Sequence, residues 1–207
     1  MFQSVITSEQ QLRDIIGTPS ELVQNKVIHY LDYHCQSFIK SSPLVFISSA
    51  NKKGECDVSP RGDHPGFVSI VNEHYLLIPE RPGNKRADTL TNILENPQIG
   101  LLFVIPNMGE TLRINGKAMI ITDEEHLTSL AVHNKVPKLA IAVHVEECFL
   151  HCAKAFIRSN LWNYESWIKK EECPNPAKIL ADHAKIPNLR EEQIANRLKE
   201  GYEQRLY

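Results

Sequence analysis

Three cations lie within six positions in the stretch Glu80-Arg81-Pro82-Gly83-Asn84-Lys85-Arg86. Proline and glycine shape a loop there, and we expect Asn84 to open a helix. A helix N-terminus presents unpaired backbone N–H groups and a partial positive charge. Arginine and lysine side chains beside it would suit a phosphate dianion. The alternative is a solvated basic turn, which is the commoner role of short basic runs.

Two further polar stretches have side chains that suit an anion. In Asp57-Val58-Ser59-Pro60-Arg61-Gly62-Asp63, Ser59 and Arg61 could both donate to an anion, although an ordinary long turn has the same composition. In the stretch 110–117, strand alternation places Thr111, Arg113 and Asn115 on one face. Such a face lines a ligand site in some β proteins and meets solvent in others.

The segment from His144 to Trp162 gives two weaker signals. His144, Cys148, His151 and Cys152 are zinc-ligand types, but they lack the paired CxxC or HxxxH spacing of structural zinc sites, so we assign no metal. If the next segment is helical, Lys154, Arg158 and Trp162 share one side at i, i+4 and i+8. That arrangement suits an anionic or π-faced ligand, or a helix that docks Trp162 into the core.

Composition excludes several classes of protein. The 207 residues carry 23 Lys and Arg against 25 Asp and Glu, a formal charge of −2, so we expect neither nucleic-acid nor membrane binding by the chain as a whole. No GxxxxGK[ST], GxGxxG, HExxH or GxSxG motif is present. The N-terminus does not resemble a signal peptide, and the five cysteines are odd in number, so we expect a reduced, cytoplasmic protein.

Hydrophobic periodicity predicts helices at both ends and strands between them. The first 42 residues are predicted to be helical: a helix over 8–16 stopped by Gly17, and a second with an apolar stripe of Leu22, Val23, Val27 and Leu31. About seven strands follow, with helices at 86–95 and 123–134, and helices return at 174–185 and 189–206. This spacing favours an antiparallel barrel or sandwich. The predicted strands are 44–50, 55–59, 67–71, 75–79, 99–105, 112–121 and 139–145.

Residues 44–162 resemble the pyridoxamine 5′-phosphate oxidase-like, FMN-binding split-barrel family. The matching stretches, in order, are DVSPRGD, LLIPERPGNKR, ADTLTNILENP, IGLLFVIP, ETLRINGKA and HCAKAFIRSNLW. Two departures set the chain apart from the true oxidases: Glu110 stands where the family has an arginine, and the chain ends Arg205-Leu206-Tyr207 rather than in the oxidase signature. The resemblance therefore points to an uncharacterised subgroup and not to a pyridoxamine phosphate oxidase.

The resemblance implies a six-stranded antiparallel Greek-key split barrel that forms a homodimer with FMN at the interface. It further implies a barrel over 43–162, between helical segments 1–42 and 163–207. The cofactor-binding positions implied by the family are strand backbone beside the flavin ring, cations and polar groups around the phosphate, and two residues from the partner subunit. In this sequence they are Ser59, Arg61, Leu77, Ile78, Pro79, Arg81, Asn84, Lys85, Arg86 and Thr111, with Arg158 and Trp162 from the partner.

The function implied is FMN-dependent oxidoreduction of a small molecule that the sequence does not identify. No catalytic acid or base is assigned; His151 and Cys152 are the candidates. The alternative is a non-enzymatic protein that binds or senses flavin, haem or another tetrapyrrole, since fold does not fix function. A third hypothesis is a metal-dependent hydrolase built on the histidine and cysteine cluster from His144 to Cys152.

Overall fold

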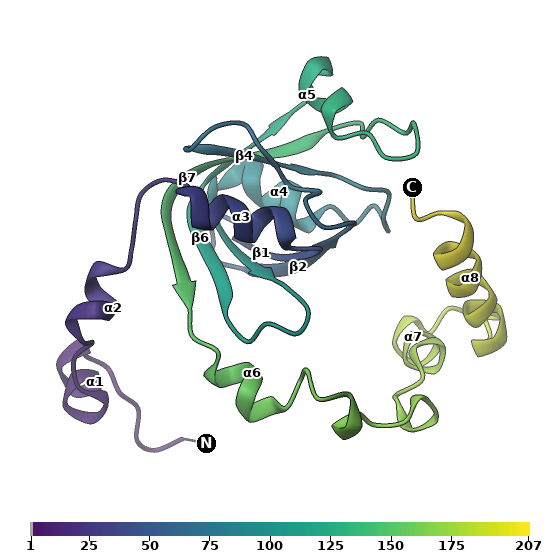
Figure 1. Cartoon of the computed structure of the whole chain (residues 1–207). Helices are drawn as coiled ribbons and strands as arrows, with labels where there is room; N and C mark the ends of the chain where they lie inside the picture. The colour runs from purple at the N-terminus through teal and green to yellow at the C-terminus, as the bar shows by residue number, and fades with distance from the viewer. Residues whose placement is uncertain (1) are drawn as a thin grey trace.

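Seven antiparallel strands form one sheet in the order β2-β1-β5-β6-β7-β4-β3 in the computed structural model, which describes residues 2–207 (Figure 1). The end strands β2 and β3 are not paired with each other, so the barrel is open along one side. The predicted fold class, an antiparallel split barrel with flanking helices, is confirmed, with a seventh strand of two residues. The strands are β1 (Leu44–Ala50), β2 (Cys56–Gly62), β3 (Ser69–Ile70), β4 (Tyr75–Pro79), β5 (Gln98–Val104), β6 (Thr111–Ile121) and β7 (Ala140–His151).

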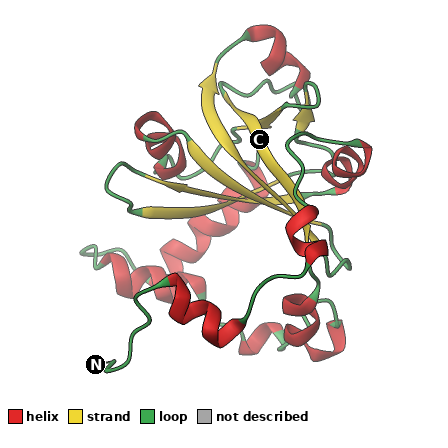
Figure 2. Ribbon diagram, turned by 90° about the vertical axis from the view of Figure 1, so that its left-hand side faces the viewer, coloured by secondary structure: helices red, strands yellow, loops and turns green. Residues whose placement is uncertain are grey.

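The helices divide into those that cover the barrel and those that lie away from it. α3 and α4 lie against the strands, whereas the helices at the two ends of the chain stand apart (Figures 1 and 2). Within residues 2–207, no helix combines the length and apolar character needed to cross a membrane. The division into segments 1–42, 43–162 and 163–207 stays a prediction. The helices are α1 (Glu9–Ile16), α2 (Glu21–Asn25), α3 (Tyr33–Ser41), α4 (Asp88–Glu95), α5 (Glu124–Ser129), α6 (Lys154–Ser159), η1 (Tyr164–Ser166), η2 (Lys170–Glu172), α7 (Pro176–Ala184) and α8 (Glu191–Gln204).

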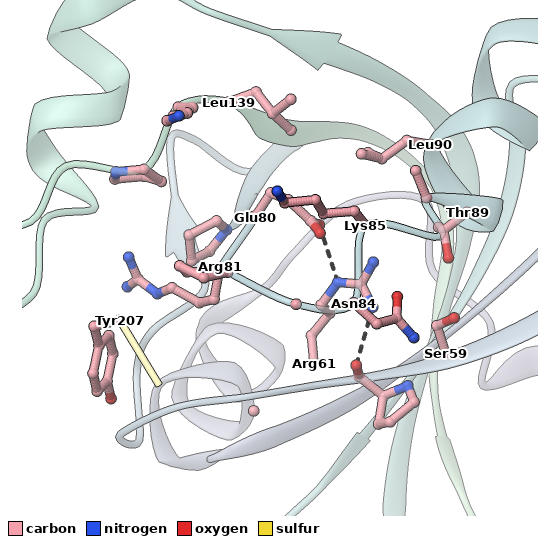
Figure 3. Close-up of a pocket in the computed structure, with 18 of the residues that line it drawn as sticks. Ser59, Arg61, Glu80, Arg81, Asn84, Lys85, Thr89, Leu90, Leu139 and Tyr207 are labelled. Carbon is pink, nitrogen blue, oxygen red and sulfur yellow. Dashed lines mark hydrogen bonds and ion pairs between the residues drawn. The ribbon is translucent and has the colours of Figure 1, made fainter. Parts of the chain in front are cut away.

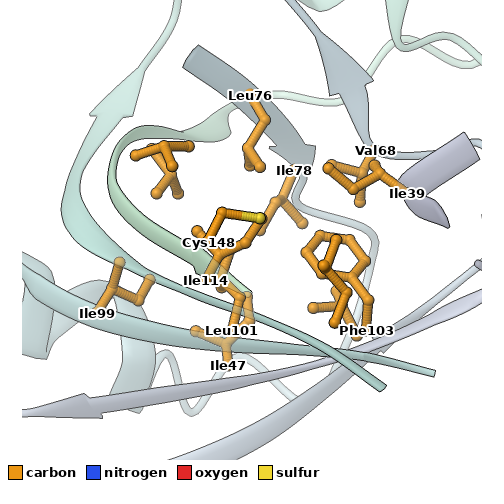
Figure 4. Close-up of a cluster of buried hydrophobic side chains, with 14 of the residues drawn as sticks. Ile39, Ile47, Val68, Leu76, Ile78, Ile99, Leu101, Phe103, Ile114 and Cys148 are labelled. Carbon is orange, nitrogen blue, oxygen red and sulfur yellow. The ribbon is translucent and has the colours of Figure 1, made fainter. Parts of the chain in front are cut away.

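The hydrophobic core fills the barrel and is closed by α3 (Figure 4). Alternate residues of β5 and β6 point inward, as the twofold period of a strand requires, and α3 adds Phe38 and Ile39. We predicted that β5 would be buried on both faces. Its inward residues Ile99, Leu101 and Phe103 are buried, but Gly100 and Leu102 on the other face are only half-buried, because the barrel core covers one face of the strand.

The long strand β7 is hydrogen-bonded on both sides. β6 pairs along its whole length, and β4 pairs with its first half, from Ala140 to His144. Beyond β4, the chain before α3 continues the same edge: Ile28 and Cys148 exchange two backbone hydrogen bonds, and Lys26 Nζ donates to the Leu150 carbonyl. The N-terminal segment is thus attached to the barrel through β7.

Several predicted boundaries are wrong, each for a local reason. β2 continues through Pro60 to Gly62, because an edge strand tolerates a proline on its unpaired side. β7 runs six residues beyond the predicted end at 145, paired throughout with β6. α2 has only five residues, and Leu22 and Val23 of its predicted apolar stripe are exposed. Leu31 is buried, but it lies beyond the helix. The helix predicted over 8–16 is confirmed, with Ser8 capping it and Gly17 (φ 75°) ending it.

A register shift in the β6–β7 pair at Asn115 and Gly116 generates the first prediction. A Cβ on Gly116 would overlap the backbone carbonyl of His144, which a hydrogen-bonded strand cannot easily move. Gly116→Ala should therefore lower the free energy of unfolding by about 1–3 kcal/mol. Urea denaturation followed by circular dichroism measures this.

Gly100→Ala is the matched control, because Gly100 faces Asn115 across β5 and β6 and its added Cβ would make only ordinary contacts at 3.6 and 3.7 Å. A loss of stability in Gly100→Ala as large as that in Gly116→Ala would contradict the proposed overlap.

Candidate anion-binding site

A cavity of about 1030 Å³ lies between the end of the edge strand β2 and the end of β4. Its walls come from five segments: the end of β2, Phe67 in the β2–β3 connection, the end of β4 with the basic turn and the start of α4, the chain entering β7, and the last two residues. These segments are far apart in sequence, so the cavity exists only in the folded chain. The lining residues are 59–62, 67, 79–90, 135–139 and 206–207.

β2 supplies the first set of polar groups. Its odd-numbered residues Asp57, Ser59 and Arg61 are half-buried, whereas the residues between them are exposed, as expected for one face of an edge strand. One oxygen of the Asp57 carboxylate accepts hydrogen bonds from Ser59 Oγ (2.9 Å) and Thr89 Oγ1 (2.7 Å). Because Thr89 is in the first turn of α4, this carboxylate fixes the helix start beside β2.

Two arginines at the site are held by carboxylates. Arg61 Nε donates to Glu80 at 3.2 Å, and Arg81 Nε donates to Asp63 at 2.8 Å, so the β2 end and the basic turn are joined twice. Figure 3 shows Arg61 close to Glu80 and Asn84, with Ser59 on the same strand as Arg61. Each guanidinium has five N–H donors, so both retain donors for a bound anion. Both arginines are therefore held in place by their carboxylates and can still donate to a bound anion.

Asp63 also binds the end of the chain. The Tyr207 hydroxyl donates to the second Asp63 oxygen at 2.6 Å, and Lys135 Nζ donates to the Tyr207 backbone oxygen at 2.7 Å. Burial alone would raise the pKa of Asp63, but hydrogen bonds from Tyr207, the His64 backbone N–H and Arg81 outweigh it and lower the pKa. The same hydrogen bond to Asp63 raises the pKa of Tyr207. The carboxylate therefore stays ionised and holds the chain end at the cavity.

The basic turn differs from its prediction in one respect. Asn84 does not cap the helix: its side-chain oxygen accepts from the Arg86 N–H at 2.9 Å, and α4 begins only at Asp88. The N-cap position is Ala87, which has a left-handed backbone (φ 59°) and no side chain that can cap. Lys85 is also left-handed (φ 63°). Such residues cost free energy and are concentrated at binding sites.

The cavity is strongly basic, although the chain as a whole has a net charge of −2. Six cationic side chains line it, against the two carboxylates of Glu80 and Asp88. A cleft lined by one sign of charge focuses the field and attracts ligands of the opposite sign. The arrangement therefore suits an anion. The six cations are Arg61, Arg81, Lys85, Arg86, Lys135 and Lys138.

Seven of the twelve predicted binding residues line this cavity, namely Ser59, Arg61, Pro79, Arg81, Asn84, Lys85 and Arg86. Leu77 and Ile78 precede Pro79 on β4, but both side chains are buried: Ile78 lies in the barrel core and Leu77 packs in a second cluster with Leu127 and Leu130. Only the backbone of these two residues could therefore serve a ligand. Thr111 is buried where β6 pairs with His151 of β7, and it does not line the cavity. Arg158 belongs to α6, just beyond the His151 end of β7, and does not line the cavity either.

Trp162 also lies beyond the His151 end of β7, and it is not on a helix with Lys154 and Arg158. α6 ends at Ser159, and Asn160 takes a left-handed backbone that turns the chain. The Trp162 ring stacks on Phe156 with centroids 5.6 Å apart, and its N–H donates to the Met108 carbonyl at 2.7 Å. The prediction of one shared helix face is therefore wrong for Trp162.

The histidine and cysteine cluster does not form a metal site. Cys148 is buried against Cys35 with their sulfurs 3.1 Å apart, whereas His151 and Cys152 are exposed. Within residues 2–207, no three His, Cys, Asp or Glu side chains gather as metal ligands would. The hypothesis of a metal-dependent hydrolase built on these residues is not supported. The hydrogen bond with Cys35 and burial raise the pKa of the Cys148 thiol, so it behaves as a core residue.

Lys135, Lys138 and Tyr207 are three of the lining residues that were not predicted from the sequence. Lys135 and Lys138 lie in the connection between α5 and β7, where the only signal is two lysines around Pro137. Tyr207 reaches the cavity through contacts between residues more than 70 positions apart, which no local pattern indicates.

An open antiparallel barrel with a cation-lined cavity is an arrangement that suits an anionic small molecule. Residues 31–152, more than half of the chain, match the family model described as pyridoxamine 5′-phosphate oxidase. The protein belongs to that family. A comparison with curated protein sequences gives no significant match.

Three solved structures illustrate the range of similar folds. HupZ of Group A Streptococcus is 20% identical over 57% of this chain and 92% of its own, with a TM-score of 0.47. An FMN-binding protein of Syntrophomonas wolfei is 11% identical over 56% and 83% (TM-score 0.44). A Clostridium acetobutylicum protein related to general stress protein 26 is 15% identical over 57% and 85% (TM-score 0.42).

The Asp63 contacts generate a pH prediction. A carboxyl whose pKa is lower in the folded than in the unfolded chain stabilises the fold above its unfolded value, about 3.9, and this stabilisation is lost as the pH falls through the folded value. Asp63→Asn should therefore lower the melting temperature at pH 7 and have a shrinking effect below about pH 4. Thermal unfolding of both proteins across pH 3–7 measures this. A difference in melting temperature that stays constant from pH 3 to pH 7 would contradict the lowered pKa of Asp63.

Proposed function

We propose that the cavity binds FMN through its phosphate and that the protein is an FMN-dependent oxidoreductase of a small molecule, working as a homodimer. The observation that carries the proposal is the charge of the cavity: six cations against two carboxylates in a chain that is acidic overall. Membership of the pyridoxamine 5′-phosphate oxidase family supports a flavin as the anionic ligand.

The size and chemistry of the cavity fit a phosphorylated cofactor of this kind. A volume of about 1030 Å³ is at the upper end of the range for small-molecule sites, about 300–1,000 Å³. Ser59 and the uncapped start of α4 offer donors beside the cations, and Phe67, Pro79 and Leu90 add apolar surface for a planar ring. A phosphate needs cations and backbone donors together, and both occur here.

The cations have different tasks in this proposal. Arg61 and Arg81 are oriented by Glu80 and Asp63, so they present fixed donors at low entropic cost. Lys85 is exposed and has no carboxylate partner within residues 2–207, which leaves it available to neutralise a phosphate. Arg86 pairs with Asp88 at the helix start. An arriving dianion would find two preorganised guanidinium groups and one available ammonium group.

Three of the remaining predicted residues would act from a second chain. Thr111, Arg158 and Trp162 lie near the His151 end of β7, and none of them lines the cavity of its own chain. A homodimer in which this part of one barrel meets the cavity of the other would bring both sets of residues to one ligand.

FMN would supply the redox chemistry, the transfer of electrons or hydride to or from a small substrate. The chain's own residues would bind and orient it. The arginines and Lys85 hold the charge, and the backbone of β4 beside Pro79 lies next to the cavity. Tyr207, held by Asp63 and Lys135, forms part of the wall and limits the access of water.

The double variant Lys85→Ala/Arg86→Ala tests the phosphate assignment. Charge-assisted hydrogen bonds contribute about 1.5–3 kcal/mol each, so we expect the dissociation constant for FMN to rise about 100-fold. Quenching of flavin fluorescence on titration into protein stripped of ligand measures it, and riboflavin, which lacks the phosphate, should lose far less.

The control is Lys52→Ala/Lys53→Ala, which removes the same charge from the exposed β1–β2 turn and should leave FMN affinity within about threefold. Equal affinities in the two double variants would show that the basic turn does not hold the phosphate.

A further inference from the structure

Two terminal arms leave the barrel and bury almost nothing on it. The N-terminal arm (residues 2–27) contains α1 and α2, neither of which has a buried residue. The C-terminal arm (residues 152–205) contains α6, η1 and η2, also without buried residues, and then α7 and α8, which bury only Ala177 and Ile194. In Figure 1, α1 and α2 lie to the lower left of the barrel, α6 below it, and α7 and α8 to its right, all apart from the strands.

The exposed area of the chain is too large for a monomer. A compact monomer of 23.6 kDa exposes roughly 9,800 Å². This chain exposes 14820 Å². The excess is about 5,000 Å² per chain, or about 10,000 Å² for two copies, which is more than the roughly 2,000–5,000 Å² that both partners of an obligate homodimer commonly bury in total. The chain therefore has the surface of one member of an extensive complex.

The excess surface is apolar, and it is concentrated on the arms. Among the described residues, the N-terminal arm exposes eight large hydrophobic side chains and the C-terminal arm nine, against ten on the rest of the chain. Leu12, Ile15 and Ile16 form the apolar side of α1 at i, i+3 and i+4, and all three are exposed. Trp167 and Ile168 on the C-terminal arm are 59% and 63% exposed. Apolar patches on this scale mark interaction surfaces.

Both arms are fixed to the same end of the barrel. The N-terminal arm joins β7 at the Ile28–Cys148 hydrogen bonds, and the C-terminal arm begins where β7 ends at His151. The C-terminal arm is also held at its other end, because Tyr207 binds Asp63 at the cavity. Its nine exposed hydrophobic side chains lie between these two attachments.

We propose that the two arms clasp a second copy of this chain, so that each protomer's arms cover the partner's barrel instead of its own. This rests on the homodimer of the proposed function and adds the surface that forms it. In a closed twofold dimer the same surface of each chain is buried against the other chain, so the arms of both protomers would be covered. The arm that begins at α6 also carries Arg158 and Trp162, and the clasp places them beside the partner rather than beside their own cavity.

The experiment begins with light scattering on the full chain at micromolar concentration, with and without added FMN. The expected mass is twice 23.6 kDa in both states. A photo-crosslinking residue is then introduced at Ile15 in a mixture of ¹⁴N- and ¹⁵N-labelled chains. We expect cross-linked peptide pairs that combine the two labels, which arise only when an arm contacts another chain.

Ile15→Glu/Ile16→Glu should raise the dimer dissociation constant at least about 100-fold. The control Leu94→Glu on α4, where the native side chain is 77% exposed against 70% and 64% for the two isoleucines, should change it by less than about threefold. Circular dichroism checks that both variants are folded.

A monomeric wild-type chain, cross-links confined to single labels, or equal dissociation constants in the two variants would each overturn the clasp. A mixed-label dimer that fails to bind FMN would instead support the clasp and contradict the flavin proposal. A monomer that binds FMN would support the flavin proposal and contradict the clasp. The failure of one proposal can therefore be distinguished from the failure of the other.

Discussion

The molecule depends on β7 being hydrogen-bonded along both edges. At its Ala140 end it holds β4, whose last residue leads directly into the basic turn. At its His151 end it holds the start of β6, the attachment of the N-terminal arm at Ile28 and the beginning of the C-terminal arm. This strand thus connects the segment that leads into the basic turn with the segments that carry the two arms.

Sequence patterns predicted those parts of the site that depend on local structure. Ser59 and Arg61 share one face because strand residues alternate. The cations from Arg81 to Arg86 lie in a turn that Pro82 and Gly83 indicate. Asn84 was wrong as a helix cap, because its side chain bonds within the turn. Lys135, Lys138 and Tyr207 meet the turn only after folding, and no local signal places them there.

The fold was predictable to a similar extent. The barrel class follows from the strand spacing and the family resemblance, and the core residues of β5 and β6 follow from alternation. The arms are different, because their helices form as periodicity suggests but leave Ile15, Ile16 and Leu22 exposed. An amphipathic pattern predicts that a face is buried without saying against which chain.

The most direct test is the absorbance spectrum of the freshly purified protein, with any ligand released by heat and identified by mass. The account predicts the two visible and near-ultraviolet bands of an oxidised flavin, with FMN as the released species at about one per chain. A colourless protein that also fails to bind added FMN, or one that takes up haemin with a Soret band and releases no flavin, would contradict it.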